Sequence, residues 1–390
     1  MSSFPSESLA ETPELLTTEN VCAWLASLEL EGDGVPRAPP LRAREIGGGN
    51  LNYAFAVTDA AGVSAFVKQA PDFIKCLGAD FKLTTARVRF EHDALVEMRR
   101  HAPPNSVPAV RAFARGRCAL VLEDLAPREL LRARLMAGDA REAPARAGAR
   151  LLAAVHEGTR GDGALAARFA NSAMCGITEA FVFTYPFEEH ETNKHSAGLD
   201  ARVAAMRADG GLRDAVARAR ATFATSKEAL VHGDFHAGSV MTDGEDAWAI
   251  DAEFVFYGPA GFDVGLFLAG YAFAHCAAAA RGGAGAAAQC ARLRACAGAA
   301  WEAYAAGVGA AHAPGALADA FGALGCELMR RVLGAAHMDD LEAIEDADAK
   351  LRAENLALDV GEAMVRRAAA PDAASDGVAP LLGLLEASVA

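Results

Sequence analysis

Two aspartates, each placed just after a short apolar run, are the feature that most constrains how this chain can fold. Asp234 lies three residues after Val231, and Asp251 lies directly after Ile250. Apolar, partly β-branched runs of this kind are typical of short buried strands, and Gly233 beside an aspartate is typical of a tight turn. The spacing predicts a strand, a loop and a returning strand, which would bring both carboxylates to one end of a hairpin.

Kinase-like phosphotransferases use such a pair of aspartates. One carboxylate accepts or orients the proton of the acceptor hydroxyl, and the second holds Mg²⁺ against the phosphates of ATP. In protein kinases the motif H-R-D-x-x-x-x-N places a metal-binding amide where this chain has Ser239. His-Gly-Asp in place of His-Arg-Asp favours a kinase of small molecules. Alone, His-Gly-Asp is more commonly a turn with a capping Asp. Ser239, Asp251 and Glu253 at these offsets favour catalysis instead.

A glycine cluster upstream leads into an alternating strand, in which one face is formed by Leu51, Tyr53, Phe55 and Val57. Glycines let a turn adopt positive φ and let backbone N–H groups approach phosphate oxygens. We therefore expect nucleotide contacts at Gly47, Gly48, Gly49 and Asn50. A plain hairpin turn explains the cluster equally well. A P-loop or a dinucleotide fold matches poorly, because the chain has neither a Walker lysine nor a G-x-G-x-x-G before a helix.

A second strand, at residues 64–68, ends in Lys68. This is the position of the kinase lysine that pairs with the α- and β-phosphates, although a solvated lysine at a strand end is the ordinary alternative. A helix is predicted from about Thr84 to Arg100, capped by Thr84 or Thr85, with an apolar side of Val88, Leu95 and Met98. Within it, Glu91 is the candidate partner of Lys68, and an exposed helix glutamate is the simpler alternative.

A strand over residues 119–123 ends at a break marked by Pro127. A kinase changes lobes at such a point, so backbone groups from Glu123 to Leu125 are expected to meet the adenine edge of ATP.

Length and composition fit two lobes. A chain of 390 residues with 52% hydrophobic residues can bury two sizeable cores. The net charge of −14 argues against nucleic acid or an anionic membrane as the main partner. The apolar stretch Val264–Ala280 is interpreted as a buried helix, begun by an N-cap from Gly261–Asp263. Scattered cysteines and an acidic N-terminus without a targeting pattern predict a reduced protein in the cytoplasm.

These motifs together resemble the 5-methylthioribose kinases, small-molecule kinases of the aminoglycoside-phosphotransferase-like group, and most of all the plant-type members. The resemblance runs from about residue 41 to about residue 360. It is carried by Gly47–Asn52, Phe66–Ala70, His232–Met241, Ile250–Gly265 and Met329–Asp348.

The resemblance implies roles at matched positions. Asp234 would be the catalytic base acting on the anomeric hydroxyl of the sugar, and Asp251 would bind Mg²⁺ with Glu253 and Ser239 completing the shell. Arg330 and Arg331 would bind the thioribose, which suits the fixed fork of guanidinium donors. Consecutive helix side chains point about 100° apart, so one arginine is free to anchor Asp234 or a loop instead.

Three departures from the family pattern affect loops near the substrate. The usual Gly-Glu-Ser-Trp-Pro is Gly78–Lys82 here, and the usual Asp-Pro-Glu is Asp251–Glu253 with alanine in the middle. Residues 184–196 are also hard to match. None of these changes removes a phosphoryl-transfer residue, so substrate choice is the property they put in question.

The sequence thus predicts a bilobal, protein-kinase-like α+β fold. An N-terminal extension with one helix would span residues 1–40, an N-lobe of antiparallel strands 41–125, a mainly helical C-lobe 126–365, and a tail 366–390. The expected reaction is ATP-Mg²⁺-dependent phosphorylation of the 1-hydroxyl of 5-methylthioribose, a step of methionine salvage. A kinase of another small alcohol and an inactive ATP-binding pseudokinase are the alternatives. The oligomeric state is left open, with a homodimer among the expectations.

Overall fold

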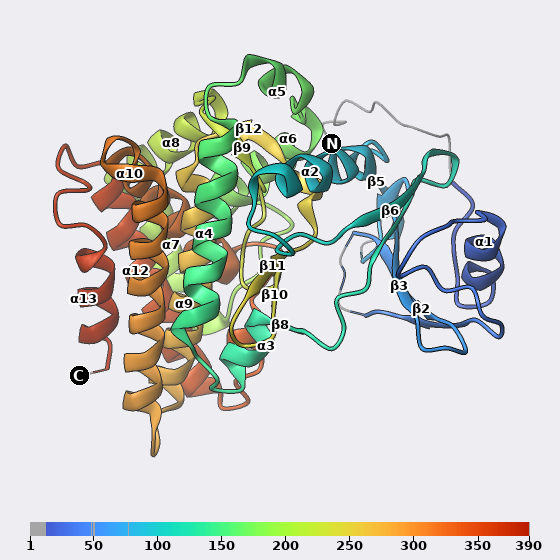
Figure 1. The fold of residues 1–390 in the computed structure, drawn as a ribbon. Coiled ribbons are helices and arrows are strands. Elements are labelled where there is room, and N and C mark those ends of the chain that lie inside the picture. The colour runs from blue at the N-terminus through green and yellow to red at the C-terminus, as the bar shows by residue number, and fades with distance from the viewer. Residues whose placement is uncertain (1–12, 48, 50, 77, 390) are drawn as a thin grey trace.

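A five-stranded antiparallel sheet forms the smaller of two lobes in the computed structural model, which describes residues 13–47, 49, 51–76 and 78–389. Figure 1 shows this lobe in blue at one side of the larger, helical lobe. The strand order is β1-β2-β3-β7-β6. The strands are β1 (Arg42–Glu45), β2 (Tyr53–Thr58), β3 (Ser64–Gln69), β6 (Val110–Ala114) and β7 (Ala119–Glu123).

The two faces of this sheet pack against different helices. Phe55 and Val57, predicted to share a face, are buried together with Leu25 of α1 (Val21–Ser27). On β7, Val121 joins that cluster, while its neighbours Leu120 and Leu122 join the core on the side of α2 (Arg87–His101). Period-two alternation thus places one helix on each face.

Helix α2 begins later than predicted. Its N-cap is Ala86, which makes no side-chain capping bond, so neither Thr84 nor Thr85 caps it in the predicted way. Thr84 instead accepts a hydrogen bond from the N–H of Ala86 in the preceding turn. The predicted apolar side of α2 is correct, because Val88, Leu95 and Met98 are all buried.

The larger lobe is mainly helical. Its long helices are α4 (Glu142–Thr159), α9 (Gly261–Arg281), α10 (Ala286–Leu333) and α12 (Ala347–Ala368), and α10 is broken at Gly309, which has non-helical dihedral angles. The shorter helices are α3 (Leu131–Met136), α5 (Gly163–Arg168), α6 (Ser172–Phe183), α7 (Asp200–Ala208), α8 (Gly210–Thr225), α11 (Asp339–Glu342) and α13 (Ala379–Ala387).

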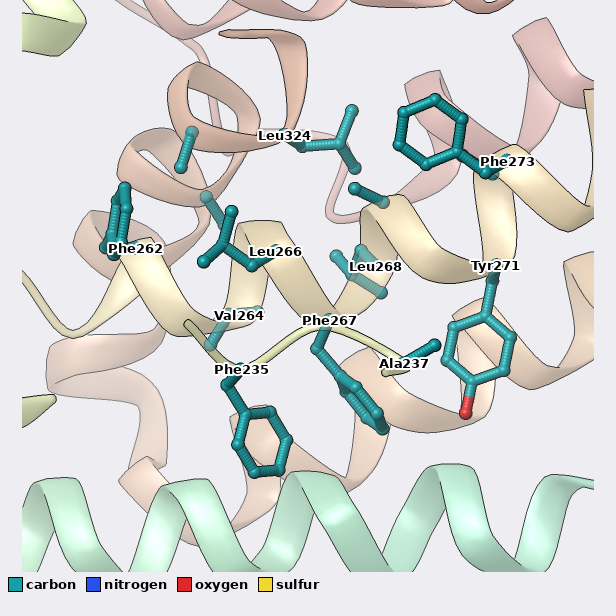
Figure 2. Packing of buried hydrophobic residues seen from close by; sticks show 14 of the residues in the cluster. Phe235, Ala237, Phe262, Val264, Leu266, Phe267, Leu268, Tyr271, Phe273 and Leu324 are labelled. Atoms are coloured by element: carbon teal, nitrogen blue, oxygen red, sulfur yellow. The ribbon is translucent and has the colours of Figure 1, made fainter. Parts of the chain in front are cut away.

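Helix α9 lies at the centre of the larger lobe. By length and composition alone it could cross a membrane, but 94% of its apolar 18-residue stretch is buried within the protein. Its side chains pack on every side, among them Phe262, Phe267 and Phe273, as Figure 2 shows. The prediction of a buried helix over Val264–Ala280 is therefore confirmed.

The strands around the two aspartates pair differently from the prediction. The strand before Asp234, β9 (Ala229–Val231), pairs with β12 (Phe256–Gly258), and the strand before Asp251, β11 (Ala247–Ala249), pairs with β10 (Val240–Thr242). The predicted single hairpin is wrong, because the chain between the aspartates forms a strand of its own. Shorter pairings add β8 (Glu129–Leu130) to β10, and join β4 (Phe73–Ile74) to β5 (Gly78–Lys82).

Candidate active site

Along the loop that carries Asp234, buried side chains alternate with partly exposed ones, and the buried side chains anchor the loop. Phe235 and Ala237 are buried and lie against α9, as Figure 2 shows, whereas Asp234 and His236 keep partial exposure. The loop passes so close to α9 that a Cβ on Gly270 would lie 2.8 Å from the Cβ of Ala237. Helix α9 therefore positions the loop by direct packing.

Asp263 holds the start of the same loop. Its Oδ2 accepts from the N–H of His232 at 2.6 Å, and its Oδ1 accepts from the N–H of Gly233 at 2.9 Å. His156 of α4 lies 3.3 Å from Oδ2 through Nε2, and its Nδ1 lies 3.0 Å from the hydroxyl of Tyr304. Asp263 was predicted to contribute to the N-cap of α9, but the N-cap is Ala260, and the carboxylate binds the loop that carries Asp234 instead.

The structure brings Lys68 to the carboxylate of Glu91, the partner predicted for it, at 2.8 Å. The same ammonium lies 2.8 Å from Oδ1 of Asp251 and 3.8 Å from Oε1 of Glu253. Burial alone would lower the pKa of Lys68, but the three carboxylates outweigh it and raise the pKa, so the lysine stays protonated. Residues from both lobes therefore share one buried cation.

Two residues that the sequence did not single out complete this cluster. The guanidinium Nε of Arg87 lies 3.1 Å from Oε2 of Glu253, and the amide of Asn52 donates to Oε1 at 2.8 Å. Arg87 also donates to Oδ1 of Asn52 at 3.2 Å. The signal that was available is the position of Arg87 one turn before Glu91, on the same face of α2.

The charges of this cluster suit a divalent cation. Lys68 and Arg87 face Glu91, Asp251 and Glu253, so these five groups carry one uncompensated negative charge when all are ionised, and burial raises the pKa of Glu91 to about 7. The side chain of Asp251 is 45% exposed, whereas Glu253 is buried. Among the residues described, no group of three or more His, Cys, Asp or Glu side chains could hold a metal by itself. Mg²⁺ bound by one or two carboxylates and the phosphates of a nucleotide fits this donor set.

Hydrogen bonds of His232 and Ser239 connect Asp251 to the loop that carries Asp234. The Nε2–H of His232 donates to the carbonyl of Ile250 at 2.8 Å, and the N–H of Ile250 donates to the carbonyl of Ser239 at 3.0 Å. Asp251 adopts a left-handed backbone, with φ of 63°, which turns the chain sharply after Ile250. These bonds place the backbone of Ser239 next to Ile250, the residue before Asp251.

Asp234 faces a cluster of charges at the end of α10. Glu327 is buried and accepts from Nε of Arg330 at 2.6 Å and from Nε of Arg331 at 2.8 Å. Burial raises the pKa of Asp234 to about 6, and the positive charges of Arg331 and Arg330 limit that rise. Although consecutive on a helix, both arginines are held by one carboxylate, and both act electrostatically on Asp234. The sequence did not identify Glu327.

His236 lies beside Asp234, with Nε2 at 3.5 Å from Oδ2 of the carboxylate. Burial, together with the charge of Arg331, lowers the pKa of His236 to about 3. Its imidazole is therefore neutral at ordinary pH.

The remaining predicted nucleotide contacts belong to the glycine cluster and to the change of lobes. Gly48 and Asn50 lie outside the described residues. Gly47 does not have the positive φ that was expected of the cluster, and a Cβ on it would meet no described atom within 4 Å. At the change of lobes, the N–H of Glu123 donates to Ala109, and the carbonyl of Leu125 accepts from the N–H of Arg128. The N–H of Leu125 makes no bond to any residue that the structure describes.

The chain is similar to known phosphotransferases over most of its length. The model of the phosphotransferase enzyme family matches residues 42–306. Methylthioribose kinase of Cronobacter sakazakii is 34% identical over 350 residues, covering 83% of this chain and 88% of that protein. Methylthioribose kinase of Yersinia enterocolitica is 33% identical over 365 residues, covering 86% of this chain and 91% of that protein.

A solved choline kinase from Cryptosporidium parvum covers 95% of this chain and 99% of its own length, with a TM-score of 0.53 at 12% identity, a likeness that shows the fold. The chain belongs to the phosphotransferase enzyme family. The predicted kinase-like fold and the predicted family are therefore confirmed. The finer resemblance to plant-type members, the domain boundaries and the individual site roles stay predictions.

Proposed function

We propose that this protein is an ATP-dependent kinase that phosphorylates the 1-hydroxyl of 5-methylthioribose, a step of methionine salvage. The reaction class is supported by one observation above all: Lys68, Glu91, Asp251 and Glu253 meet across the two lobes, and Asp234 lies nearby. The substrate is supported by relatives named methylthioribose kinase, which are 33% and 34% identical over most of the chain.

Asp234 accepts the proton of the acceptor hydroxyl as that oxygen attacks the γ-phosphorus of ATP. The carboxylate must be ionised for this, and with a pKa near 6 it is ionised at neutral pH. Lys68, oriented by Glu91, would pair with the α- and β-phosphates. The backbone at Gly47, Gly48, Gly49 and Asn50 would approach the phosphates, and Glu123 and Leu125 would meet the adenine edge.

Asp251 and Glu253, with Ser239, would hold Mg²⁺, which when bound offsets the charge of the ATP phosphates. The ion pair between Lys68 and Asp251 must loosen for both groups to serve the nucleotide. Arg330 and Arg331 would contact the sugar next to Asp234.

A kinase of another small alcohol is the second candidate, and the loops near the substrate favour keeping it. On β5, Phe81 is 46% exposed where the family usually has tryptophan. The altered segment 184–196 packs on the end of α10, because the N–H of Lys194 donates to the carbonyl of Gly334 at 3.2 Å. It therefore borders the arginine pair. A cytoplasmic location, a homodimer and the absence of nucleic acid or membrane partners stay predictions.

The test is ADP release by the purified protein with ATP and Mg²⁺. The acceptors are 5-methylthioribose, ribose, choline, an aminoglycoside and none. Selective turnover of 5-methylthioribose is the expected result. Turnover of a different acceptor would assign the altered loops to a new substrate. ATP binding without turnover of any acceptor would indicate a pseudokinase.

A further inference from the structure

The imidazole of His236 is fixed in one tautomer by the backbone. Its Nδ1 lies 2.9 Å from the N–H of Gly238, which donates to it. A nitrogen that accepts a hydrogen bond carries no proton, so the proton of the neutral ring is on Nε2. A doubly protonated ring is incompatible with this bond, because two N–H groups would then face each other. Nε2–H is therefore the group that faces Oδ2 of Asp234, at 3.5 Å.

The ring has little freedom to turn away from Asp234. A Cβ on Gly238 would lie 2.8 Å from Cε1 of His236 and 3.0 Å from Cζ of Arg132. Only glycine at position 238 therefore lets the imidazole and the guanidinium lie so close to the backbone of the loop. Arg132 is itself held at both ends, since its N–H donates to the carbonyl of Ala237 and its Nη2 pairs with Asp339 at 3.0 Å. His236 is enclosed by parts of the chain that are anchored elsewhere.

One carboxylate oxygen of Asp234 is available to accept a hydrogen bond from Nε2–H of His236. Its carboxylate accepts no hydrogen bond from any residue that the structure describes, and among the described Lys, Arg and His side chains only His236 has a nitrogen within 4.0 Å of it. One oxygen suffices to take the proton of the acceptor hydroxyl. The second, Oδ2, is the oxygen that faces His236. Hydrogen bonds at catalytic groups are commonly long before substrate binds and shorten in the complex.

We propose that His236 is a positioning residue for Asp234: its Nε2–H, set by the Gly238 bond and backed by Arg132, donates to Oδ2 and turns the other oxygen to the acceptor hydroxyl. This inference rests on the proposed function for its catalytic consequence. No bond to His236 is formed or broken in the reaction.

Two substitutions separate this role from a structural one. In His236→Gln the amide nitrogen reaches about where Nε2 lies and can still donate to Asp234. In His236→Asn the amide reaches only about where Nδ1 lies, so it can accept from Gly238 but cannot reach Oδ2. We expect His236→Asn to lower kcat roughly 10- to 100-fold, as misplacement of a reacting group does, with the KM for ATP unchanged. We expect His236→Gln to stay within a few-fold of the wild type.

The pH profile gives a second readout. Loss of a donor to the carboxylate raises its pKa, so the acid limb of kcat should move to higher pH in His236→Asn and stay in place in His236→Gln. Thermal unfolding of both variants checks that they are folded. Equal effects of the two variants on kcat would overturn the proposal. So would a raised KM for the acceptor with kcat unchanged, which would make His236 a substrate contact.

A measurement without any acceptor keeps this test separate from the proposed function. The carboxyl ¹³C signal of Asp234, assigned by its loss in Asp234→Asn, is titrated in the wild type and in both His236 variants. A higher pKa in His236→Asn alone supports the proposal even if no acceptor is phosphorylated. An unchanged pKa in His236→Asn overturns it even if 5-methylthioribose is the substrate.

Discussion

At the scale of single residues, Asp234 shows a conflict between stability and chemistry. A carboxylate removed from water is penalised in its ionised form, and the arginines at the end of α10 offset only part of that penalty. In the proposed reaction, the same ionised form accepts a proton from the acceptor hydroxyl. If Asp234 is the base, its pKa of about 6 lies close to neutral pH, the condition under which proton transfer is efficient.

We predict that Asp234→Asn stabilises the folded protein at neutral pH. The folded pKa is raised from 3.8 to about 6, so the penalty is absent below pH 4 and fully present above pH 6. Its size is on the order of 1–3 kcal/mol, since one pKa unit corresponds to about 1.4 kcal/mol. Thermal unfolding should show a higher Tm for the variant at pH 7.5 and little difference at pH 4. Asp80→Asn, at an exposed position, is the control. A lower Tm for Asp234→Asn at pH 7.5 would contradict the prediction.

Replacement of the same residue by alanine tests its role in turnover. Asp234→Ala should lose nearly all phosphorylation, by at least about 10³-fold, because both the base and its orienting effect are removed. ATP-Mg²⁺ binding, measured by titration calorimetry, should be retained, since Lys68 and Asp251 lie elsewhere in the site. Turnover close to that of the wild type would show that the catalytic assignment is wrong.

At the scale of elements, α9 packs directly against both the loop that carries Asp234 and α10. Three of its glycines permit close approach, and two of them, Gly265 and Gly270, face different neighbours. A Cβ on Gly270 would lie 2.8 Å from Cβ of Ala237 in the loop, whereas a Cβ on Gly265 would lie 2.5 Å from the carbonyl oxygen of Ala320 in α10. The two positions therefore separate the effect on catalysis from the effect on packing.

We predict that Gly270→Ala and Gly265→Ala differ in what they lose. Both should destabilise the fold by about 1–3 kcal/mol, as overpacking does. Gly270→Ala should also lower kcat about 10-fold or more, because the loop that carries Asp234 must move. Gly265→Ala should keep the kcat of its folded fraction. Denaturant unfolding and steady-state kinetics on the two variants provide the comparison, and equal kcat values would argue against α9 as the support of the loop.

The elements also show which parts of the fold were accessible from sequence. Alternation in β2 and the apolar side of α2 are local patterns, and both were predicted correctly. The pairing of β9 with β12 was not, because register among short strands is decided by tertiary packing and by the intervening β10. Asn52 and Glu253 lie in different lobes, and no local pattern links them. Motifs of fixed spacing pointed to Lys68, Asp234 and Asp251. No such motif contains Arg87, Arg132 or Glu327, so the sequence did not single them out.

At the scale of the whole molecule, the cluster around Lys68 and Glu253 joins the two lobes. Arg87 and Asn52 come from the smaller lobe and Glu253 from the larger one, and Arg87 is fully buried. A buried ion pair contributes little net stability against an apolar replacement, but loss of one partner leaves an uncompensated buried charge. The lobes are therefore coupled through groups that cannot be removed singly without cost.

We predict that Arg87→Met destabilises the protein by about 3–5 kcal/mol, because the carboxylate of Glu253 is left buried without its guanidinium. Combining it with Glu253→Gln should recover part of that loss, since the amide is neutral and can still accept from Asn52. Activity should not recover, because Glu253 is expected to help hold Mg²⁺. Urea unfolding of the four proteins of this cycle gives the coupling energy between the two residues.

The control cycle uses Arg202 and Asp359, whose atoms Nη2 and Oδ1 lie 2.6 Å apart where Asp359 is 64% exposed. That pair should couple by no more than about 1 kcal/mol, as surface pairs do. If Arg87 couples the lobes, Arg87→Met should also broaden or split the unfolding transition, since the face of the small sheet that packs on α1 has a buried cluster separate from the core that α2 shares with the larger lobe. A single sharp transition with a coupling no larger than that of the control would mean that the lobes are held together by α2 packing against the larger lobe, and not by this charge cluster.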